Sequence, residues 1–266
     1  LSPTNSKFLS TISISIFLIF INQHIIYKIN LLYKQLLIMN KSKLIIVRHG
    51  QSEWNKQDKF TGWVDVPLSV EGKEEAKAAG EKIKKLDFNF DYSFSSILKR
   101  SIQTYEEIDK VCNINNELIQ DWRLNERHYG NLQGLNKQEM RNLHGDEQVL
   151  IWRRSYDVKP PKINSESHKE LFNQECFNNV EINPFPKNES LKDTVIRLKP
   201  FISNILFPII ESSKNIVISA HGNSIRAMLK YIEKISDEDI VKIEIPTGKP
   251  MLLEFNDSKL ELKKYI

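Results

Sequence analysis

The chain has 266 residues, of which 40% are hydrophobic and 27% are charged, so its composition fits a globular protein and excludes a fibrous or disordered chain. The formal net charge is +4, but residues 1–39 hold three lysines and no acidic residue, so the remaining sequence is nearly neutral. Because no basic stripe or arm follows residue 40, we expect no nucleic-acid partner.

Residues 1–38 are expected to be a non-native upstream extension or a leader. Their apolar run, Phe8 to Ile21, is shorter than the roughly 20 residues that cross a bilayer, so we expect no membrane partner. The first methionine is Met39, which stands just before an apolar strand. A cleaved leader is the alternative, although no small-residue cleavage site follows the run. We therefore expect one cytoplasmic catalytic domain over residues 39–266.

Alternating strands and helices are predicted after Met39. Lys43–Val47 is apolar and β-branched, which predicts a buried strand that ends at Arg48-His49-Gly50. The pattern then predicts a helix over 69–86, a strand over 91–95, a helix over 98–111 and a short strand over 117–120.

The second half of the chain begins with an irregular stretch. Residues 160–189 contain four prolines and many Asn and Ser, which predicts loop structure. A long helix over 190–210, with kinks at Pro200 and Pro208, a buried strand over 215–220 and a helix from Asn223 follow. The alternation predicts an α/β fold, a three-layer α/β/α sandwich with a mainly parallel sheet.

The two cysteines, Cys112 and Cys176, have unrelated sequence contexts and no CxxC spacing. This arrangement predicts two reduced thiols rather than a disulfide framework or a zinc site. We expect no metal.

Three His-Gly dipeptides occur in the sequence, where composition alone predicts about 0.2. His144-Gly145 ends a helical stretch, and Gly145 fits a helix C-cap. His49-Gly50 and His221-Gly222 each follow a buried strand and precede Gln-Ser or Asn-Ser. Because ligands bind at the carboxyl ends of parallel strands, we expect the imidazoles of His49 and His221 to face one pocket.

Such a pocket suits a phosphoryl group. Arg48 can pair with its oxygens, the glycines let backbone N–H groups approach, and the helix after His221 directs its positive end there. A neutral imidazole whose other nitrogen donates to a backbone carbonyl can attack phosphorus. The chemistry therefore favours a phosphohistidine, while two satisfied loop histidines are the alternative.

Further anion partners and a proton carrier are available. Arg100 lies two residues into the helix after the second strand, whereas the doublet Arg153-Arg154 is by its chemistry alone more typical of a solvated surface. Glu126 is a candidate general acid/base, with a simple ion pair to Arg123 or Arg127 as the equal alternative.

The motifs together resemble one family. Leu44-Ile-Ile-Val-Arg-His-Gly-Gln-Ser-Glu-Trp-Asn55, Arg123-Leu-Asn-Glu-Arg-His-Tyr-Gly130, Trp152-Arg-Arg-Ser-Tyr-Asp-Val158, Glu189-Ser-Leu-Lys-Asp-Thr194 and Ala220-His-Gly-Asn-Ser-Ile-Arg226 are similar to motifs of the cofactor-dependent phosphoglycerate mutases of the histidine phosphatase superfamily. The resemblance runs from about Lys43 to Phe255.

The resemblance implies an isomerase of glycolysis and gluconeogenesis. It assigns His49 as the phosphorylated nucleophile, Glu126 as proton donor and acceptor, and His221 as the residue that stabilises the transferring group. The implied substrate contacts are Arg48, Asn55, Thr61, Gly62, Arg100, Glu126, Arg127, His128, Tyr129, Lys137, Arg153, Arg154, Gly222 and Asn223.

The implied reaction interconverts 3-phosphoglycerate and 2-phosphoglycerate through phosphohistidine and bound 2,3-bisphosphoglycerate, which is the cofactor, with no metal. The resemblance also implies a homodimer or homotetramer. Only eleven residues follow Phe255, fewer than the family usually carries, and we expect this to raise the hydrolytic side activity. A bisphosphoglycerate phosphatase or a broad phosphomonoesterase is the alternative function.

Overall fold

The computed structural model describes residue 28 and residues 42–178, 180–256 and 259–266. The chain divides into two compact units, Leu1–Lys41 and Ser42–Ile266, and the second unit holds every element discussed below. Apart from Lys28, the expected leader over residues 1–38 lies outside the described residues. Within the described ranges, no helix is both long and apolar enough to cross a membrane.

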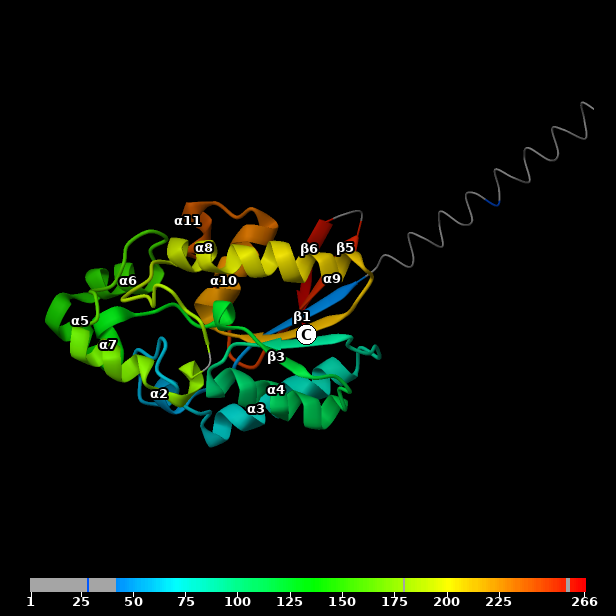
Figure 1. The fold of residues 1–266 in the computed structure, drawn as a ribbon, viewed down its shortest axis with the longest axis horizontal. Coiled ribbons are helices and arrows are strands. Elements are labelled where there is room, and N and C mark those ends of the chain that lie inside the picture. Colours follow the sequence, from blue (N-terminus) through cyan, green and yellow to red (C-terminus); the bar gives the residue numbers. More distant parts are fainter. Residues whose placement is uncertain (1–27, 29–41, 179, 257–258) are drawn as a thin grey trace, which may run out of the picture. The chain divides into compact units, whose positions relative to one another are not determined.

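A six-stranded sheet forms the centre of the second unit (Figure 1). Its strand order is β3-β2-β4-β1-β5-β6. The first four strands in this order are parallel, and β5 is antiparallel to β1 and β6, so the predicted mainly parallel sheet is confirmed. The strands are β1 (Lys43–Arg48), β2 (Tyr92–Ser95), β3 (Leu118–Gln120), β4 (Ile216–Ala220), β5 (Pro250–Asn256) and β6 (Lys259–Tyr265).

Helices cover both faces of the sheet, as the predicted three-layer sandwich requires (Figure 1). One face carries α3 and α4, and the other carries α8, α9 and α10. The described α-helices are α2 (Glu53–Lys56), α3 (Val70–Lys84), α4 (Lys99–Cys112), α5 (Lys137–His144), α6 (Asp146–Arg154), α7 (Ser165–Phe172), α8 (Leu191–Phe201), α9 (Phe207–Glu211), α10 (Gly222–Glu233) and α11 (Asp237–Ile240).

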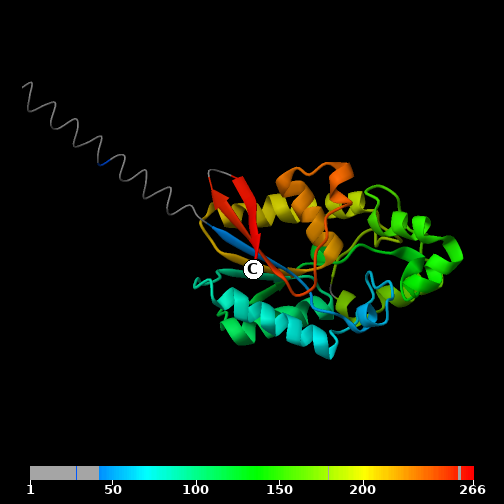
Figure 2. The same cartoon turned by 180° about the vertical axis from the view of Figure 1, so that it is seen from behind.

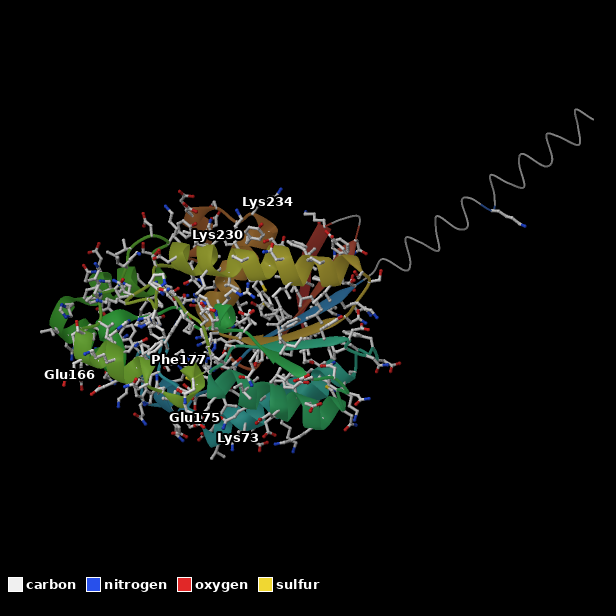
Figure 3. All side chains as sticks on the ribbon, viewed as in Figure 1. Lys73, Glu166, Glu175, Phe177, Lys230 and Lys234 are labelled. Atoms are coloured by element: carbon white, nitrogen blue, oxygen red, sulfur yellow. The ribbon has the colours of Figure 1, made fainter. Side chains whose placement is uncertain are left out.

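The side chains of β1 alternate between two apolar cores, because successive residues of a strand point to opposite faces. Leu44 and Ile46 pack with α8 and α10, whereas Ile45 and Val47 pack with α3 and α4. Burying one such side chain contributes about 1.5–3 kcal/mol, so β1 is fixed from both sides. Charged side chains such as Lys73, Glu166 and Lys234 lie at the periphery (Figure 3).

Two parts of the chain differ from the predicted elements. The stretch over 160–189 is not wholly irregular, because it contains α7 and a 3-10 turn at Glu175–Phe177. The Asn164 side chain caps α7 by accepting from the Ser167 N–H. A second strand, β6, pairs with β5 in a hairpin beside β1 (Figure 2). No element was predicted there.

The long helix over 190–210 is confirmed as three segments. Ser190 and Asp193 form a capping box at the start of α8. Pro200 lies inside α8, and its missing N–H cannot complete the helical hydrogen-bond ladder. A π-helical segment, Ile202–Leu206, follows, and α9 then begins with Pro208 in its first turn.

Candidate active site

The parallel strands β1 and β4 place His49 and His221 at the same edge of the sheet, as predicted. Arg48 pairs in register with Ala220, and the His49 N–H donates to the Ala220 carbonyl at 2.9 Å. The two imidazole centroids are 4.9 Å apart at an interplanar angle of 61°. Adjacent parallel strands therefore bring together two residues that lie far apart in the sequence.

The hydrogen bonds of His49 define its tautomer. Its Nδ1 lies 2.6 Å from the Gly50 carbonyl oxygen, which can only accept. Nδ1 therefore carries the proton, and Nε2 keeps a free lone pair. Burial, then the charges of Arg100 and Arg48, lower the pKa of His49 well below its ordinary value. The residue is consequently neutral and competent as a nucleophile.

The turn after β1 needs a glycine. A Cβ on Gly50 would lie 2.1 Å from the Gly72 carbonyl oxygen, and one on Gly72 would lie 1.9 Å from the Gln51 oxygen. These two backbones therefore touch where α3 begins. The close contact fixes the direction in which the chain leaves β1, and so the direction of the His49 side chain.

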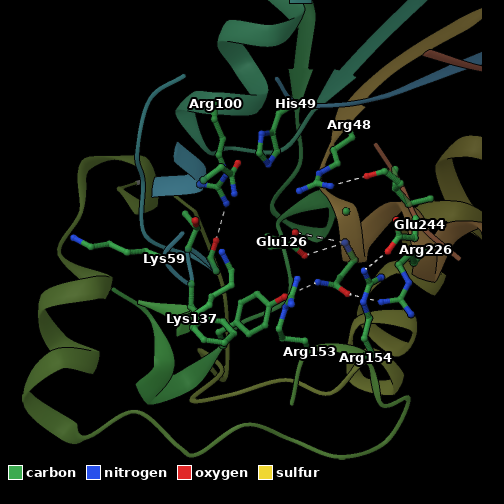
Figure 4. Close-up of a pocket in the computed structure, with 18 of the residues that line it drawn as sticks. Arg48, His49, Lys59, Arg100, Glu126, Lys137, Arg153, Arg154, Arg226 and Glu244 are labelled. Atoms are coloured by element: carbon green, nitrogen blue, oxygen red, sulfur yellow. Dashed lines mark hydrogen bonds and ion pairs between the residues drawn. The ribbon is translucent and has the colours of Figure 1, made fainter. Parts of the chain in front are cut away.

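His49 opens onto a cavity of about 370 Å³ (Figure 4). Seven Lys and Arg side chains and two carboxylates line it, so its field attracts anions. The lining residues are Arg48, His49, Asn55, Lys59, Phe60, Thr61, Gly62, Arg100, Glu126, Tyr129, Lys137, Arg153, Arg154, Gly222, Asn223, Arg226, Glu244, Ile245 and Pro246.

Arg48 points into this cavity beside His49 (Figure 4). Its NH1 donates to the Ile245 carbonyl at 2.6 Å, which fixes the guanidinium. Its Nε is buried without a hydrogen-bond partner in the described part of the chain. A Cβ on Gly222 would lie 3.4 Å from that Nε, so the glycine leaves room beside it. Burial lowers the pKa of Arg48.

Arg100, the second residue of α4, approaches from the same side as His49 (Figure 4). Its NH1 and NH2 donate to the carbonyls of Val64 and Gly62 at 3.0 and 2.7 Å, while its Nε is left without a partner among the described residues. Gly62 adopts a φ of +59°, which glycine accepts without strain. Burial lowers the pKa of Arg100 to about 10.

Glu126 is 8% exposed, and its carboxylate faces the cavity. Oε1 accepts from the backbone N–H of Arg127 at 2.7 Å and from the backbone N–H of Asn223 at 3.1 Å. Asn223 lies in the first turn of α10, so the positive end of this helix faces the carboxylate. The group is thus held in place but remains accessible from the cavity.

His221 lies behind the cavity and does not line it. Its Nε2 is 2.7 Å from the Ser96 hydroxyl oxygen, and its buried Nδ1 has no hydrogen-bond partner in the described ranges. Burial, then the charges of Arg100 and the neighbouring His49, lower its pKa well below the ordinary value. The ring is therefore neutral, with one nitrogen held and one free.

The structure brings most of the predicted contacts together. Thirteen of the sixteen predicted residues line the cavity, and the three that do not are Arg127, His128 and His221. Arg127 stacks its guanidinium 4.7 Å from the Tyr129 ring centroid and donates to the Trp152 and Arg153 carbonyls. It therefore holds two elements of the wall, α6 and the Tyr129 segment.

The structure places His128 within the protein interior. Its ring packs against Trp63 and Phe185, and its Nδ1 accepts from the Gly130 N–H at 2.9 Å. Burial, assisted by His168, lowers the pKa of His128 to about 3. His128 therefore packs in the protein interior and does not form part of the cavity wall.

Sequence reasoning missed six lining residues, which are Lys59, Phe60, Arg226, Glu244, Ile245 and Pro246. The sequence spacing could have identified Arg226, because it lies three residues after Asn223 and four after Gly222, on the same face of a helix. No sequence pattern indicated that the segment Glu244 to Pro246 would line the cavity. Its place depends on contacts from Arg48 and from Arg154, whose NH2 lies 2.8 Å from Glu244 Oε1.

The donor set fits a small polyanion. Three residues of the cavity wall have a buried donor without a partner among the described residues, namely Nε of Arg48, Nε of Arg100 and the hydroxyl of Thr61. Buried donors need an acceptor, and phosphate oxygens supply several. A bisphosphorylated acid such as 2,3-bisphosphoglycerate matches this set. Over the described residues, no group of three His, Cys, Asp or Glu could hold a metal ion.

Comparison with known proteins agrees with this geometry. The chain matches the histidine phosphatase superfamily (branch 1) over residues 44–175 and 166–266. It is 48% identical to 2,3-bisphosphoglycerate-dependent phosphoglycerate mutase 2 of Lactiplantibacillus plantarum over 225 residues, which cover 83% of this chain and 96% of the relative. It is 48% identical to the 2,3-bisphosphoglycerate-dependent phosphoglycerate mutase of Actinobacillus succinogenes over 84% of this chain and 100% of the relative.

Solved structures share the fold at lower identity. A mycobacterial glucosyl-3-phosphoglycerate phosphatase superposes with a TM-score of 0.65 at 23% identity, over 84% of this chain and 97% of that chain. A putative alpha-ribazole-5'-P phosphatase from Escherichia coli gives a TM-score of 0.64 at 16% identity, over 84% and 95%. The chain therefore belongs to the histidine phosphatase superfamily, branch 1, and within it to the 2,3-bisphosphoglycerate-dependent phosphoglycerate mutases.

Proposed function

We propose that this protein interconverts 3-phosphoglycerate and 2-phosphoglycerate through a phosphorylated His49. The observation that carries the proposal is the His49 ring itself. Its Nδ1 is bonded to the Gly50 carbonyl, so Nε2 presents a lone pair to a cavity that also holds Glu126. A nucleophile, a proton carrier and a cationic wall in one cavity are the parts that phosphoryl transfer needs.

The proposed cofactor is 2,3-bisphosphoglycerate, which when bound supplies the phosphoryl group that primes His49. Arg48 and Arg100 line the cavity beside His49, and their positive charges neutralise the group that His49 carries. His221 stabilises the transferring group, with its ring oriented by Ser96. The donors are fixed before the reaction, so they cost little reorganisation in the transition state.

Glu126 moves the proton. As the 2-hydroxyl oxygen of 3-phosphoglycerate attacks phosphorus and the P–N bond of phosphohistidine breaks, the Glu126 carboxylate accepts the hydroxyl proton. When His49 takes up the 3-phosphoryl group, Glu126 returns the proton to the 3-oxygen, and 2-phosphoglycerate leaves. Each cycle therefore restores both residues.

The remaining cavity residues are proposed to hold the substrate. The carboxylate and the second phosphate of the bound phosphoglycerate are negatively charged and need cations away from His49. Lys137, Arg153 and Arg154 lie on the opposite side of the cavity (Figure 4). The smaller contacts are assigned to Asn55, Thr61, Gly62, Tyr129, Gly222 and Asn223, which line the cavity. Arg127 and His128 do not line it, so they are assigned a supporting place behind the wall and no substrate contact. Such binding orients the reacting hydroxyl.

We further propose that residues 39–266 act as one catalytic domain in the cytoplasm, as a homodimer or homotetramer, without a nucleic-acid or membrane partner. The neutral composition after residue 40 supports the absence of a nucleic-acid partner. Light scattering on the purified full chain measures the oligomeric state. Fractionation of cells locates the protein.

The testing experiment follows 3-phosphoglycerate by 31P NMR in EDTA, with and without 2,3-bisphosphoglycerate. We expect 2-phosphoglycerate to form only after priming, with an acid-labile phosphoenzyme that His49→Asn abolishes. Release of inorganic phosphate without isomerisation would replace the proposal by a phosphatase. Activity that is lost in EDTA and restored by a divalent cation would contradict the metal-free reaction.

A further inference from the structure

The backbone that carries Glu126 is held by two side chains outside the cavity. They are Glu189, which precedes α8, and Arg197, in the middle of α8. Glu189 opens the motif Glu189-Ser-Leu-Lys-Asp-Thr194, which contributes no residue to the cavity wall. Neither residue lines the cavity.

Arg197 donates to the loop on the N-terminal side of Glu126. Its NH1 lies 2.6 Å from the Arg123 carbonyl oxygen and 3.3 Å from that of Asn125. Its NH2 lies 3.2 Å from the Asn125 oxygen and 3.2 Å from the Glu126 oxygen. NH1 also donates to the Trp122 carbonyl at 3.4 Å, so one planar guanidinium binds four carbonyls and sets the path of the chain up to Glu126 itself.

Glu189 holds the other side of the loop. Its Oε2 accepts from the His128 N–H at 2.9 Å, and its own N–H donates to the His128 carbonyl at 2.8 Å. The same carboxylate binds Arg197, with Oε1 2.7 Å from Nε and Oε2 3.0 Å from NH2. Glu189 and Arg197 thus form one unit that is hydrogen-bonded to the loop backbone on both sides of Glu126.

This unit is buried and has little freedom. The side chains of Arg197 and Glu189 are 6% and 5% exposed. The Arg197 guanidinium lies 5.4 Å from the Trp63 ring centroid, and the Trp63 indole N–H donates to the Glu126 carbonyl. Removing one partner of a buried ion pair leaves the other charge uncompensated in the interior, which destabilises the fold, so both residues are needed to hold the loop.

We propose that Glu189 and Arg197 are positioning residues that hold the Glu126 carboxylate where it can exchange a proton with the substrate. The inference rests on the role proposed above for Glu126. Among the described residues, the carboxylate itself is bonded only to the backbone N–H groups of Arg127 and Asn223, so its direction follows the backbone that this unit fixes. A displacement of about 1 Å at a reacting group can cost about 100-fold in rate.

The experiment measures mutase activity of the full chain with Arg197→Lys and Glu189→Gln. Lysine keeps the charge but cannot bind four carbonyls and a carboxylate as the planar guanidinium does, and glutamine keeps the shape of Glu189 without its charge. We expect kcat to fall about 100-fold while KM changes less than about threefold. Arg123→Lys is the matched control, because Arg123 pairs with Asp121 in the same loop without touching the cavity, and it should retain kcat.

A double-mutant cycle separates positioning from general damage to the fold. In a Glu126→Gln background, Arg197→Lys and Glu189→Gln should change kcat by less than about threefold, because the group they position is already absent. An undiminished loss in that background would overturn the inference and leave the proposed function standing. Full activity of Glu126→Gln alone would overturn both, and a kcat of Arg197→Lys and Glu189→Gln equal to the wild type would overturn the inference.

Discussion

His49 and His221 pack edge to face with ring centroids 4.9 Å apart, and burial, followed by the charges of Arg100 and Arg48, lowers the pKa of both. Two protonated imidazoles at this distance, beside two guanidinium groups, would repel one another strongly. The neutral state of both rings is therefore a consequence of the arrangement. Because both rings are neutral, the negative charge of an incoming phosphoryl group pairs with the two arginines.

Replacing His49 by Asn should abolish phosphoenzyme formation, because no other described nucleophile reaches the same position. The matched control is His144→Asn, which changes the third His-Gly dipeptide, at the exposed end of α5 and outside the cavity. We expect the control to retain activity within about twofold of the wild type. Phosphoenzyme on the His49→Asn variant, detected by 31P NMR, would refute the assignment.

The stability of the protein should fall as the pH drops below about 6.5. The pKa of His128 is about 3 in the folded protein, so below an ordinary pKa of about 6.5 the unfolded chain binds a proton that the folded chain refuses. Above about pH 6.5 His128 therefore leaves the free energy of unfolding unchanged. Between the unfolded and folded pKa values it lowers the free energy of unfolding by up to about 1.4 kcal/mol for each pH unit.

Urea unfolding at pH 5 to 8 measures this effect. His128→Asn keeps an acceptor for the Gly130 N–H, and its free energy of unfolding should decline less steeply with acid than that of the wild type. His144→Asn serves as the exposed control, with the wild-type slope. Equal slopes for all three proteins would show that His128 takes up its proton in the folded state.

Replacing Arg100 by Lys should lower kcat by about 100- to 1000-fold, as expected for the loss of a preorganised donor to the transferring group. Lysine cannot bind the Gly62 and Val64 carbonyls and still present a third donor to the cavity. The neighbouring Lys99→Arg is the control, since Lys99 is exposed. Steady-state kinetics with 3-phosphoglycerate distinguishes the two, and equal kcat values would argue against a role in transfer.

Removing the charge of Glu244 should tighten substrate binding. Glu244 pairs with Arg154 at the cavity, and its side chain is 78% exposed, so the carboxylate competes with an anionic substrate for one cation. We expect Glu244→Gln to lower KM by about two- to fivefold, because exposed pairs are worth at most about 1 kcal/mol. Glu166→Gln, an exposed change on α7, is the control, and an unchanged KM for Glu244→Gln would show no competition.

The sequence predicted the strands before His49 and His221 well. The apolar run before His49 and the run before His221 each predicted a strand, and the parallel pairing of β1 and β4 confirms that both histidines leave the same sheet edge. Local polarity patterns suffice here, because a strand buried on both faces reads as a continuous apolar run. The helix α7 within 160–189 was missed because its apolar positions are few and prolines and asparagines flank it.

The sequence by itself predicted the two histidines, Arg48 and Arg100 as site residues, since they stand at or close to predicted strand ends, whereas the roles predicted for Glu126 and for Arg153 and Arg154 depended on the family resemblance. Only the tertiary structure decided which of these side chains face the cavity and which support the cavity wall from behind. His128 turns inward, whereas Arg226 and Glu244 join the cavity wall. The backbone grip of Glu189 and Arg197 was equally invisible, because hydrogen bonds to carbonyls depend on how α8 packs against a loop about 70 residues earlier. Side-chain direction at that distance is a property of packing, which sequence spacing does not encode.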